Sequence, residues 1–193
     1  MTDRIYRSFL ERQRQQAREL TAASDVVELH TPGPRGVPLP LSDTDAEPPD
    51  RYLALFSART LVRDPRGGIA TRQGFAAGFF FPTDYCRHAP GPLVVCWLGP
   101  QNAFNPHIVA DRGFICCGRL APATPLVDLV ELVHSIATYR TYTLADALDP
   151  EAATWARAHL ADLPVDHAPL RRRAVTFRTT AAAAPRCAPA EDR

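Results

Sequence analysis

The amino-acid sequence predicts an α+β domain with one helix at its start, a four-stranded antiparallel sheet next and further helices at its end. Residues 4–23 are strong helix formers that place apolar side chains on one side of a helix. Residues 25–98 contain four apolar segments separated by turn and proline signals, and residues 125–163 return to helical spacing. The connections are too short for parallel crossovers, so we expect an antiparallel meander with the helices on one face.

The first helix is expected over residues 4–23, with Phe9 and Leu20 on its apolar side. The segment "DVVELH" (25–30) follows it and predicts the first strand. The next segment, Thr31 to Asp50, is rich in proline, which cannot donate a backbone hydrogen bond to a neighbouring strand. We therefore expect a loop without regular strand pairing there.

Three further strands are expected before residue 100. The segment "RYLALFSARTLV" (51–62) alternates large apolar with smaller residues, and the turn signal "DPRGG" follows it. The segment "IATRQGFAAGFFFP" (69–82) predicts the next strand, which Pro82 ends. The segment "PLVVCWL" (92–98) predicts the fourth, and Gly99-Pro100 breaks it.

Two helices are expected after residue 120. The segment "PLVDLVELVHSIATY" (125–139) has apolar residues at helical spacing all along, so it predicts a buried helix opened by Pro125. The segment "DPEAATWARAHLADL" (149–163) predicts a second helix, with Asp149 as its N-cap and Pro150 at its first helical position.

The chain is expected to divide into a domain over residues 1–167 and an extension over residues 168–193. The extension contains three consecutive arginines and then a tract of alanine and proline. Such a composition buries too little apolar surface to order itself, so we expect a disordered tail from about Ala181.

Composition excludes several classes of partner. The formal net charge is +1, which favours neither nucleic acid nor an anionic membrane as a partner. The first residues lack the apolar run of a signal peptide and no segment reaches membrane-spanning length, so we expect a cytoplasmic protein without membrane contact. The five cysteines are then expected to be reduced thiols. The cysteines are Cys86, Cys96, Cys116, Cys117 and Cys187. They show no paired C-x-x-C spacing, so neither a metal nor another cofactor is expected.

Four short motifs occur in an order typical of one protein family. The segment "FFFPTDYC" (79–86) is similar to F-P-x-x-Y-P, and "FNPHI" (104–108) resembles H-P-N with its outer residues exchanged. The segment "GFICC" (113–117) matches G-x-I-C-L, and "ALDPEAATWAR" (147–157) resembles P-L-x-x-E-A-A-x-x-Y. With these motifs the chain resembles a divergent bacterial member of the ubiquitin-conjugating enzyme family, and the resemblance covers roughly Arg4 to Leu163.

The chain also departs from the family pattern. Cys86 and Cys117 stand where the family has proline and leucine, and the family's tryptophan after the catalytic cysteine is absent. The distance from the turn to that cysteine is one residue longer than usual. These departures leave open a catalytically silent variant that only binds a ubiquitin-like protein, and a cysteine hydrolase is a further alternative.

The resemblance implies a transferase with a cysteine thioester intermediate. Cys116 would accept a ubiquitin-like protein from a ubiquitin-activating-like enzyme and pass it to an amine of a protein acceptor. Relatives of this kind are encoded beside those partners, in some cases within bacterial antiviral defence loci. The alternative for Cys116 is a buried filler at a strand end, because free cysteine is often buried. Alternation along a strand predicts that Cys117 points to the opposite side, into the core.

The resemblance also implies roles for three polar residues and for the first helix. His107 would donate a hydrogen bond to the oxyanion, with a turn-stabilising role as the alternative, and Asn105 would serve mainly to shape the turn. Asp146 would orient the incoming amine, or would be a solvated residue beside a helix. The basic face of the first helix would bind the activating enzyme, or would simply be solvated: Arg4, Arg7 and Arg14.

Overall fold

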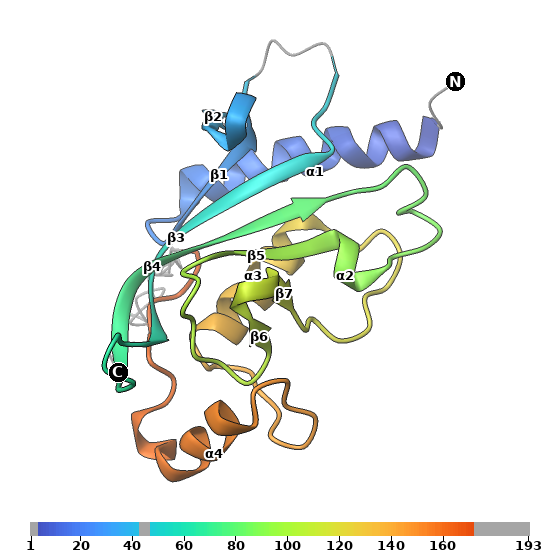
Figure 1. Ribbon diagram of the computed structural model, residues 1–193. Coiled ribbons are helices and arrows are strands. Elements are labelled where there is room, and N and C mark those ends of the chain that lie inside the picture. Colours follow the sequence, from blue (N-terminus) through green and yellow to red (C-terminus); the bar gives the residue numbers. More distant parts are fainter. Residues whose placement is uncertain (1–3, 43–46, 172–193) are drawn as a thin grey trace, which may run out of the picture.

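A curled five-stranded antiparallel sheet, covered on one face by two helices, forms the body of the protein (Figure 1). The computed structural model describes residues 4–42 and 47–171 of the 193-residue chain. The strand order is β2-β1-β3-β4-β5. The strands are β1 (Val27–Pro32), β2 (Pro38–Pro40), β3 (Arg51–Arg63), β4 (Ile69–Phe80) and β5 (Val95–Gly99). The covering helices are α1 (Arg4–Ala23) and α3 (Leu126–Ala137).

The predicted α+β class is confirmed, but the predicted number of strands is wrong. The sheet has a fifth strand, β2, inside the segment expected to be an unpaired loop. It pairs with β1 through Leu39 opposite Thr31, with prolines on both sides of Leu39. Strand β2 is at the edge of the sheet and has a neighbouring strand on one side only. Proline has no N–H, and on the open side of an edge strand no neighbouring carbonyl needs one as a donor. Proline excludes a central strand there and does not exclude an edge strand.

Smaller elements were also missed. Residues Gly91–Val94 form a helical turn, α2, so strand β5 begins only at Val95. Strands β6 (Ile108–Val109) and β7 (Phe114–Ile115) form a two-stranded ribbon in a segment for which the sequence predicts no strand pair. Strands of two residues are too short to show alternation. The remaining elements are α4 (Pro150–Ala158) and the 3₁₀ turns Pro34–Gly36, Ala110–Arg112 and Leu160–Asp162.

The main core lies between the sheet and the two covering helices. Aromatic rings from the strands pack in a row, with Phe56 stacked on Phe75 and Phe75 on Trp97. Both helices bury an apolar face against these strands, as their 3.6-residue spacing predicts. The buried residues of α1 include Phe9, Leu10, Ala17 and Leu20, and those of α3 include Leu129, Val130 and Val133.

A buried glutamine of α1 caps α3. The side-chain oxygen of Gln13 accepts a hydrogen bond from the backbone N–H of Leu126 at 2.7 Å. Its amide nitrogen donates to the carbonyl oxygen of Phe9 at 3.2 Å, so both ends of this side chain are paired. The first N–H groups of a helix lack partners within the helix, and Gln13 supplies one of them from a distant part of the chain.

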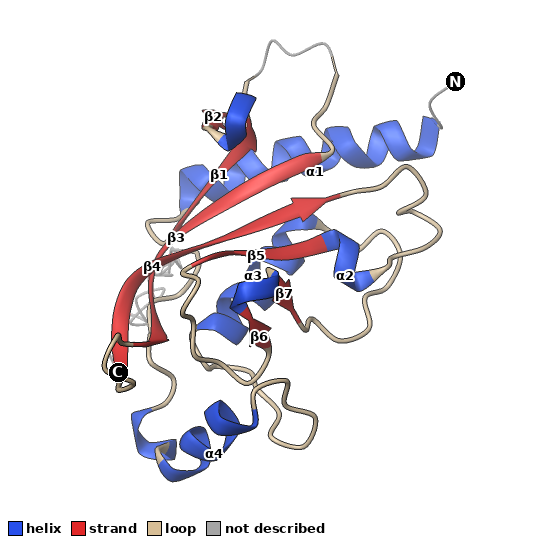
Figure 2. Cartoon of the chain, viewed as in Figure 1, coloured by secondary structure: helices blue, strands red, loops and turns tan. Residues whose placement is uncertain are grey.

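Helix α4 lies apart from the sheet, and loops connect it to the rest of the chain (Figure 2). It contacts the far end of the β3–β4 hairpin through side chains. As predicted, Asp149 caps it and accepts hydrogen bonds from the N–H groups of Glu151 and Ala152 at 3.0 Å. Arg63 of β3 reaches Glu151 through two hydrogen bonds of 2.8 and 2.9 Å. A second, smaller core lies between α4, the end of the β3–β4 hairpin and the loops beside them. Its buried residues are Leu61, Phe104, Tyr139, Ala152 and Ala156.

The segment after α4 runs back along the sheet toward the end of α1. The N–H of Val165 donates to the carbonyl oxygen of Thr138, and the Ser24 hydroxyl donates to the carbonyl oxygen of Leu170. Leu170 is buried in the main core, so packing continues beyond the expected boundary at residue 167. The expected tail from Ala181 lies outside the described residues. Within those residues, no helix has the length and apolar character needed to cross a membrane.

Candidate active site

Three of the four residues predicted to be catalytic line one pocket: Cys116, His107 and Asp146. The pocket has a volume of about 330 Å³ and lies between the end of β7, the second half of α3 and the loop that follows α3. Its other lining residues are Cys117, Gly118, two apolar residues of α3 and three hydroxyl-bearing residues of the loop: Leu132, Ile136, Thr141, Tyr142 and Thr143.

Cys116 is held directly against the turn that precedes β6. Its backbone N–H donates to the carbonyl oxygen of His107 at 2.8 Å, one residue past the last strand pair, Ile108 with Ile115. Both Cys116 and Cys117 are half-buried and both line the pocket. Cys117 packs against the core side, where alternation placed it, but it also borders the pocket beside Cys116, because strand β7 ends at Ile115 and strict alternation does not extend to the two cysteines.

The two thiols have different surroundings. Cys117 packs against the main core, and this burial raises the pKa of its thiol to about 12, with a further contribution from neighbouring Cys116. A thiol with that pKa is almost entirely protonated at neutral pH. Because the thiolate is the nucleophilic form, Cys117 is a poor nucleophile, which favours Cys116 for that role.

Asn105 is fully buried and shapes the turn. Its side-chain nitrogen donates to the carbonyl oxygen of Ile136 at 2.8 Å, and its side-chain oxygen accepts the N–H of His107 at 2.9 Å. The first bond joins the turn to the last residues of α3, and the second closes the turn itself. Asn105 does not line the pocket, unlike the other three residues predicted to be catalytic.

His107 holds the loop that follows α3. Its Nε2 accepts the backbone N–H of Thr143 at 2.8 Å and lies 3.3 Å from the Thr143 hydroxyl. An imidazole nitrogen that accepts an N–H is unprotonated, and burial lowers the pKa of His107, so the ring is neutral and carries its proton on Nδ1. Nδ1 is itself buried. In this arrangement Nε2 is an acceptor and has no proton to donate to an oxyanion.

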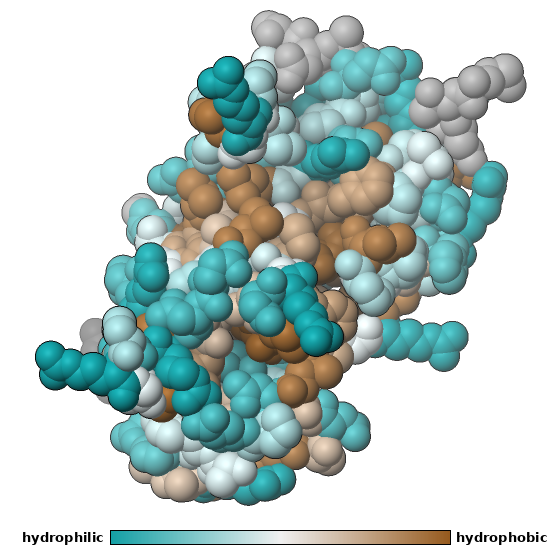
Figure 3. Space-filling model, in the orientation of Figure 1, coloured by the Kyte–Doolittle hydropathy of each residue, from teal (hydrophilic) through white to brown (hydrophobic). Residues whose placement is uncertain are grey.

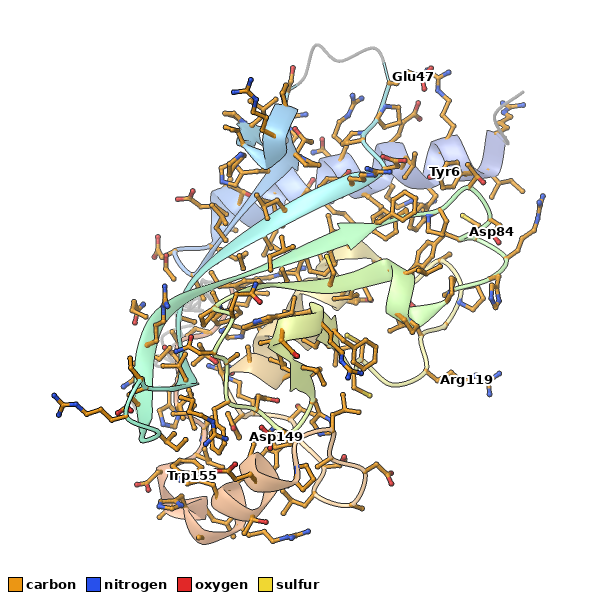
Figure 4. The ribbon with its side chains drawn as sticks, viewed as in Figure 1. Tyr6, Glu47, Asp84, Arg119, Asp149 and Trp155 are labelled. Carbon is orange, nitrogen blue, oxygen red and sulfur yellow. The ribbon has the colours of Figure 1, made fainter. Side chains whose placement is uncertain are left out.

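A second tether holds the other end of the same loop. The carbonyl oxygen of Pro106 accepts the N–H of Leu148 at 2.7 Å and that of Asp149 at 3.3 Å. Asp146 lies between the two tethered points and is exposed at the rim of the pocket. Figure 4 shows Asp149 where this loop meets α4. The turn from Asn105 to His107 thus connects the cysteine, α3 and the Asp146 loop.

The basic residues predicted to bind a partner lie elsewhere. Arg4 and Arg7 are exposed on α1, and Arg14 is half-buried there. The Nε of Arg7 lies 3.4 Å from the Oε1 of Glu11, one helical turn later, so the two side chains form an ion pair. None of the three lines the pocket.

Sequence reasoning missed the part of the site formed by α3 and its loop. Thr143 carries no motif, and Tyr142 and Leu132 read as ordinary loop and core residues. The only available signal is the polar segment between the two predicted helices, "RTYTLADALD", which is long enough to border a site. No protein-family model matches the chain, and no curated protein matches it.

Proposed function

We propose that the protein is a ubiquitin-conjugating-like enzyme that carries a ubiquitin-like protein as a thioester on Cys116 and transfers it to an amine of a protein acceptor. The observation that supports the proposal best is that Cys116 and Asp146 border one pocket although they come from different segments of the chain. The sequence resemblance suggests the partners, and it suggests a setting in bacterial antiviral defence.

The reaction requires two acyl transfers. The Cys116 thiolate would attack the thioester carbonyl of the loaded activating enzyme, whose thiol leaves. An acceptor amine would then attack the new thioester, and the Cys116 thiolate would leave as the amide bond forms. The attacking amine must lose a proton, and the exposed Asp146 carboxylate at the pocket rim is a suitable acceptor.

Within this proposal, His107 is a positioning residue. Its ring bonds the Thr143 N–H three residues before Asp146, so it sets where the carboxylate lies relative to Cys116. A misplacement of about 1 Å in such a group can slow a reaction by about 10²-fold. The occupied Nε2 also argues against a cysteine hydrolase, since that chemistry needs the imidazole as a base beside the thiol.

One observation favours the catalytically silent alternative. The side-chain donors of the turn are all occupied or buried, because Asn105 bonds α3 and His107 accepts from the loop. A transition-state oxyanion would then depend on donors outside this turn or on a rearrangement of the loop. A silent protein of this fold would bind the ubiquitin-like protein without forming a thioester.

The test is a gel assay with the cognate activating enzyme, ATP and the ubiquitin-like protein. The wild type should form an adduct that thiol reductant cleaves, and Cys116→Ser should form an oxyester that survives reductant. Cys116→Ala should form none, and the matched variant Cys117→Ala should keep the adduct. An adduct lost in Cys117→Ala but kept in Cys116→Ala assigns the nucleophile to Cys117. No adduct in the wild type, with active partners, supports the silent alternative.

A further inference from the structure

The adjacent thiols of Cys116 and Cys117 share one small space that the transfer reaction does not explain. Both line the same pocket, and both are free thiols. The backbone is fixed on each side of the pair: the N–H of Cys116 bonds to His107, and Gly118 has a positive φ of 67°. Only glycine adopts such a φ readily, so the chain turns directly after the two cysteines.

We propose that Cys116 and Cys117 form a reversible oxidation site, at which a peroxide converts the pair into a vicinal disulfide. The proposal concerns the thiols themselves and does not depend on the transfer reaction. If that reaction takes place, the disulfide blocks it, because an oxidised Cys116 cannot carry an acyl group.

The first step assigns the roles of the two sulfurs. The Cys116 thiolate attacks one oxygen of the peroxide, the O–O bond breaks, and Cys116 becomes a sulfenic acid while the second oxygen leaves as water or alcohol. Burial keeps Cys117 protonated, so it is the slower of the two to react with peroxide.

The second step closes the disulfide. The Cys117 sulfur attacks the sulfenic sulfur of Cys116, the S–O bond breaks, and the thiol proton leaves with the oxygen as water. The pair therefore loses two electrons in total, and the peroxide takes them up. Adjacency partly offsets the weak nucleophilicity of Cys117, because the attack is intramolecular, although strain in the ring that forms reduces this advantage.

The geometry predicts that this disulfide is easily reduced. Consecutive Cα atoms are about 3.8 Å apart across a trans peptide, which is shorter than the usual range of about 4.4–6.8 Å for disulfides. Strain of this kind raises the reduction potential, and strained disulfides are the labile and regulatory ones. Oxidation here would thus protect Cys116 from irreversible oxidation and end when thiol reductant returns.

The arginines of the chain make the test specific. Trypsin cleaves after Arg112 and Arg119 and releases "GFICCGR", which contains both cysteines of the pair and no other. Cys86, Cys96 and Cys187 fall on three different tryptic peptides. A vicinal disulfide therefore appears as the loss of two hydrogens within one peptide, whereas any other intramolecular disulfide joins two peptides.

The full chain would be treated with hydrogen peroxide, blocked with iodoacetamide, digested without reductant and analysed by mass spectrometry. We expect the peptide 113–119 to lose two hydrogens and to regain them after dithiothreitol. In Cys117→Ala the same peptide should instead gain two or three oxygens that dithiothreitol does not remove, or a dimedone adduct if dimedone is present. The control Cys96→Ala, which changes an exposed cysteine of β5, should behave as the wild type.

Two results would overturn the proposal. One is a wild-type peptide 113–119 that carries sulfinic or sulfonic acid with no loss of hydrogens at any peroxide dose. The other is a disulfide that joins this peptide to another tryptic peptide. The wild-type measurement needs no variant to fold and no partner protein, so a failed transfer assay leaves its outcome unaffected.

Discussion

At the residue scale, Asp146 and His107 line the same pocket but differ in their surroundings, and the proposed function gives them different roles. Asp146 is exposed, so the proposal makes its carboxylate the group that meets the incoming amine. His107 is buried and bonds the backbone of Thr143, so the proposal makes it a positioning residue. The two roles predict different responses to substitution.

Replacing the Asp146 carboxylate should slow transfer to lysine without slowing loading. Asp146→Asn removes the proton acceptor, and we expect discharge of the thioester to free lysine to fall by about 10²-fold, the size typical of a lost general base. Asp149→Asn is the matched control, because it removes the same charge from the same loop while asparagine still caps a helix. The measurement is single-turnover discharge on gels. Equal rates for Asp146→Asn and the wild type would make Asp146 a solvated residue.

Replacing His107 should also slow discharge, by a route that glutamine can restore. His107→Ala removes the acceptor for the Thr143 N–H and releases the loop that carries Asp146, so we expect discharge to fall by about 10-fold or more. His107→Gln offers a carbonyl oxygen to the same N–H and should recover most of the rate. The pH profile of discharge should keep its shape in His107→Gln. If the pH profile of discharge loses one of its titration steps in both His107→Ala and His107→Gln, the His107 ring would instead act as a base.

At the element scale, the turn before β6 holds α3 through Asn105. Asn105→Ala leaves the buried N–H of His107 without a partner and removes one of two bonds to the Ile136 carbonyl, which keeps the N–H of Tyr139 at 3.1 Å. An unpaired buried group costs about 1–3 kcal/mol and a lost hydrogen bond about 1 kcal/mol, so we expect the free energy of unfolding to fall by about 2–4 kcal/mol. The control is Asn102→Ala, which removes an exposed bond to the Arg63 carbonyl and should cost far less. Urea denaturation measures both, and similar costs would contradict the bridging role.

The elements differ in how far the sequence could predict them. The start of helix α4 was predictable to the residue, because Asp149 and Pro150 are local signals for a helix start. Its predicted end at Leu163 was wrong, because the helix ends at Ala158. Strand β2 was not predictable, because three residues of which two are prolines become a strand only when β1 lies beside them. Among the site residues, Cys116 follows from a local motif. The bond from Thr143 to His107 joins residues 36 positions apart, and no local pattern predicts such a pair.

At the scale of the whole molecule, the burial of His134 predicts that stability depends on pH. It is buried within the core, where its ring stacks on that of Phe56 with the two ring centres 6.1 Å apart. Its Nε2 is buried without a hydrogen-bond partner. Burial, with help from the nearby Arg140 charge, lowers the pKa of His134 from 6.5 to about 4, against a smaller opposing effect of Asp166. The unfolded chain therefore takes up this proton more readily than the folded protein.

Stability should fall as the pH drops from 6.5 toward 4. Above pH 6.5 the ring is neutral in both states, and below pH 4 it is protonated in both, so the contribution of His134 is lost between these values. The loss should be about 3 kcal/mol in the free energy of unfolding. Urea denaturation at several pH values should show a shallower fall for His134→Phe, while His88→Gln, an exposed control, keeps the wild-type slope. An unchanged slope in His134→Phe would contradict the assignment.

The capping of α3 by Gln13 also has a consequence for synthesis on the ribosome. Gln13 and Leu126 are 113 positions apart, so α1 leaves the ribosome long before the helix that it caps. Helix α3 has 12 residues, a length at which an isolated helix is marginal in water. When it folds, α3 covers the part of the apolar face of α1 that the strands leave exposed. The apolar face of α1 therefore stays incompletely covered until residues 126–137 emerge. Nascent chains that stop short of this point should be the form that chaperones bind.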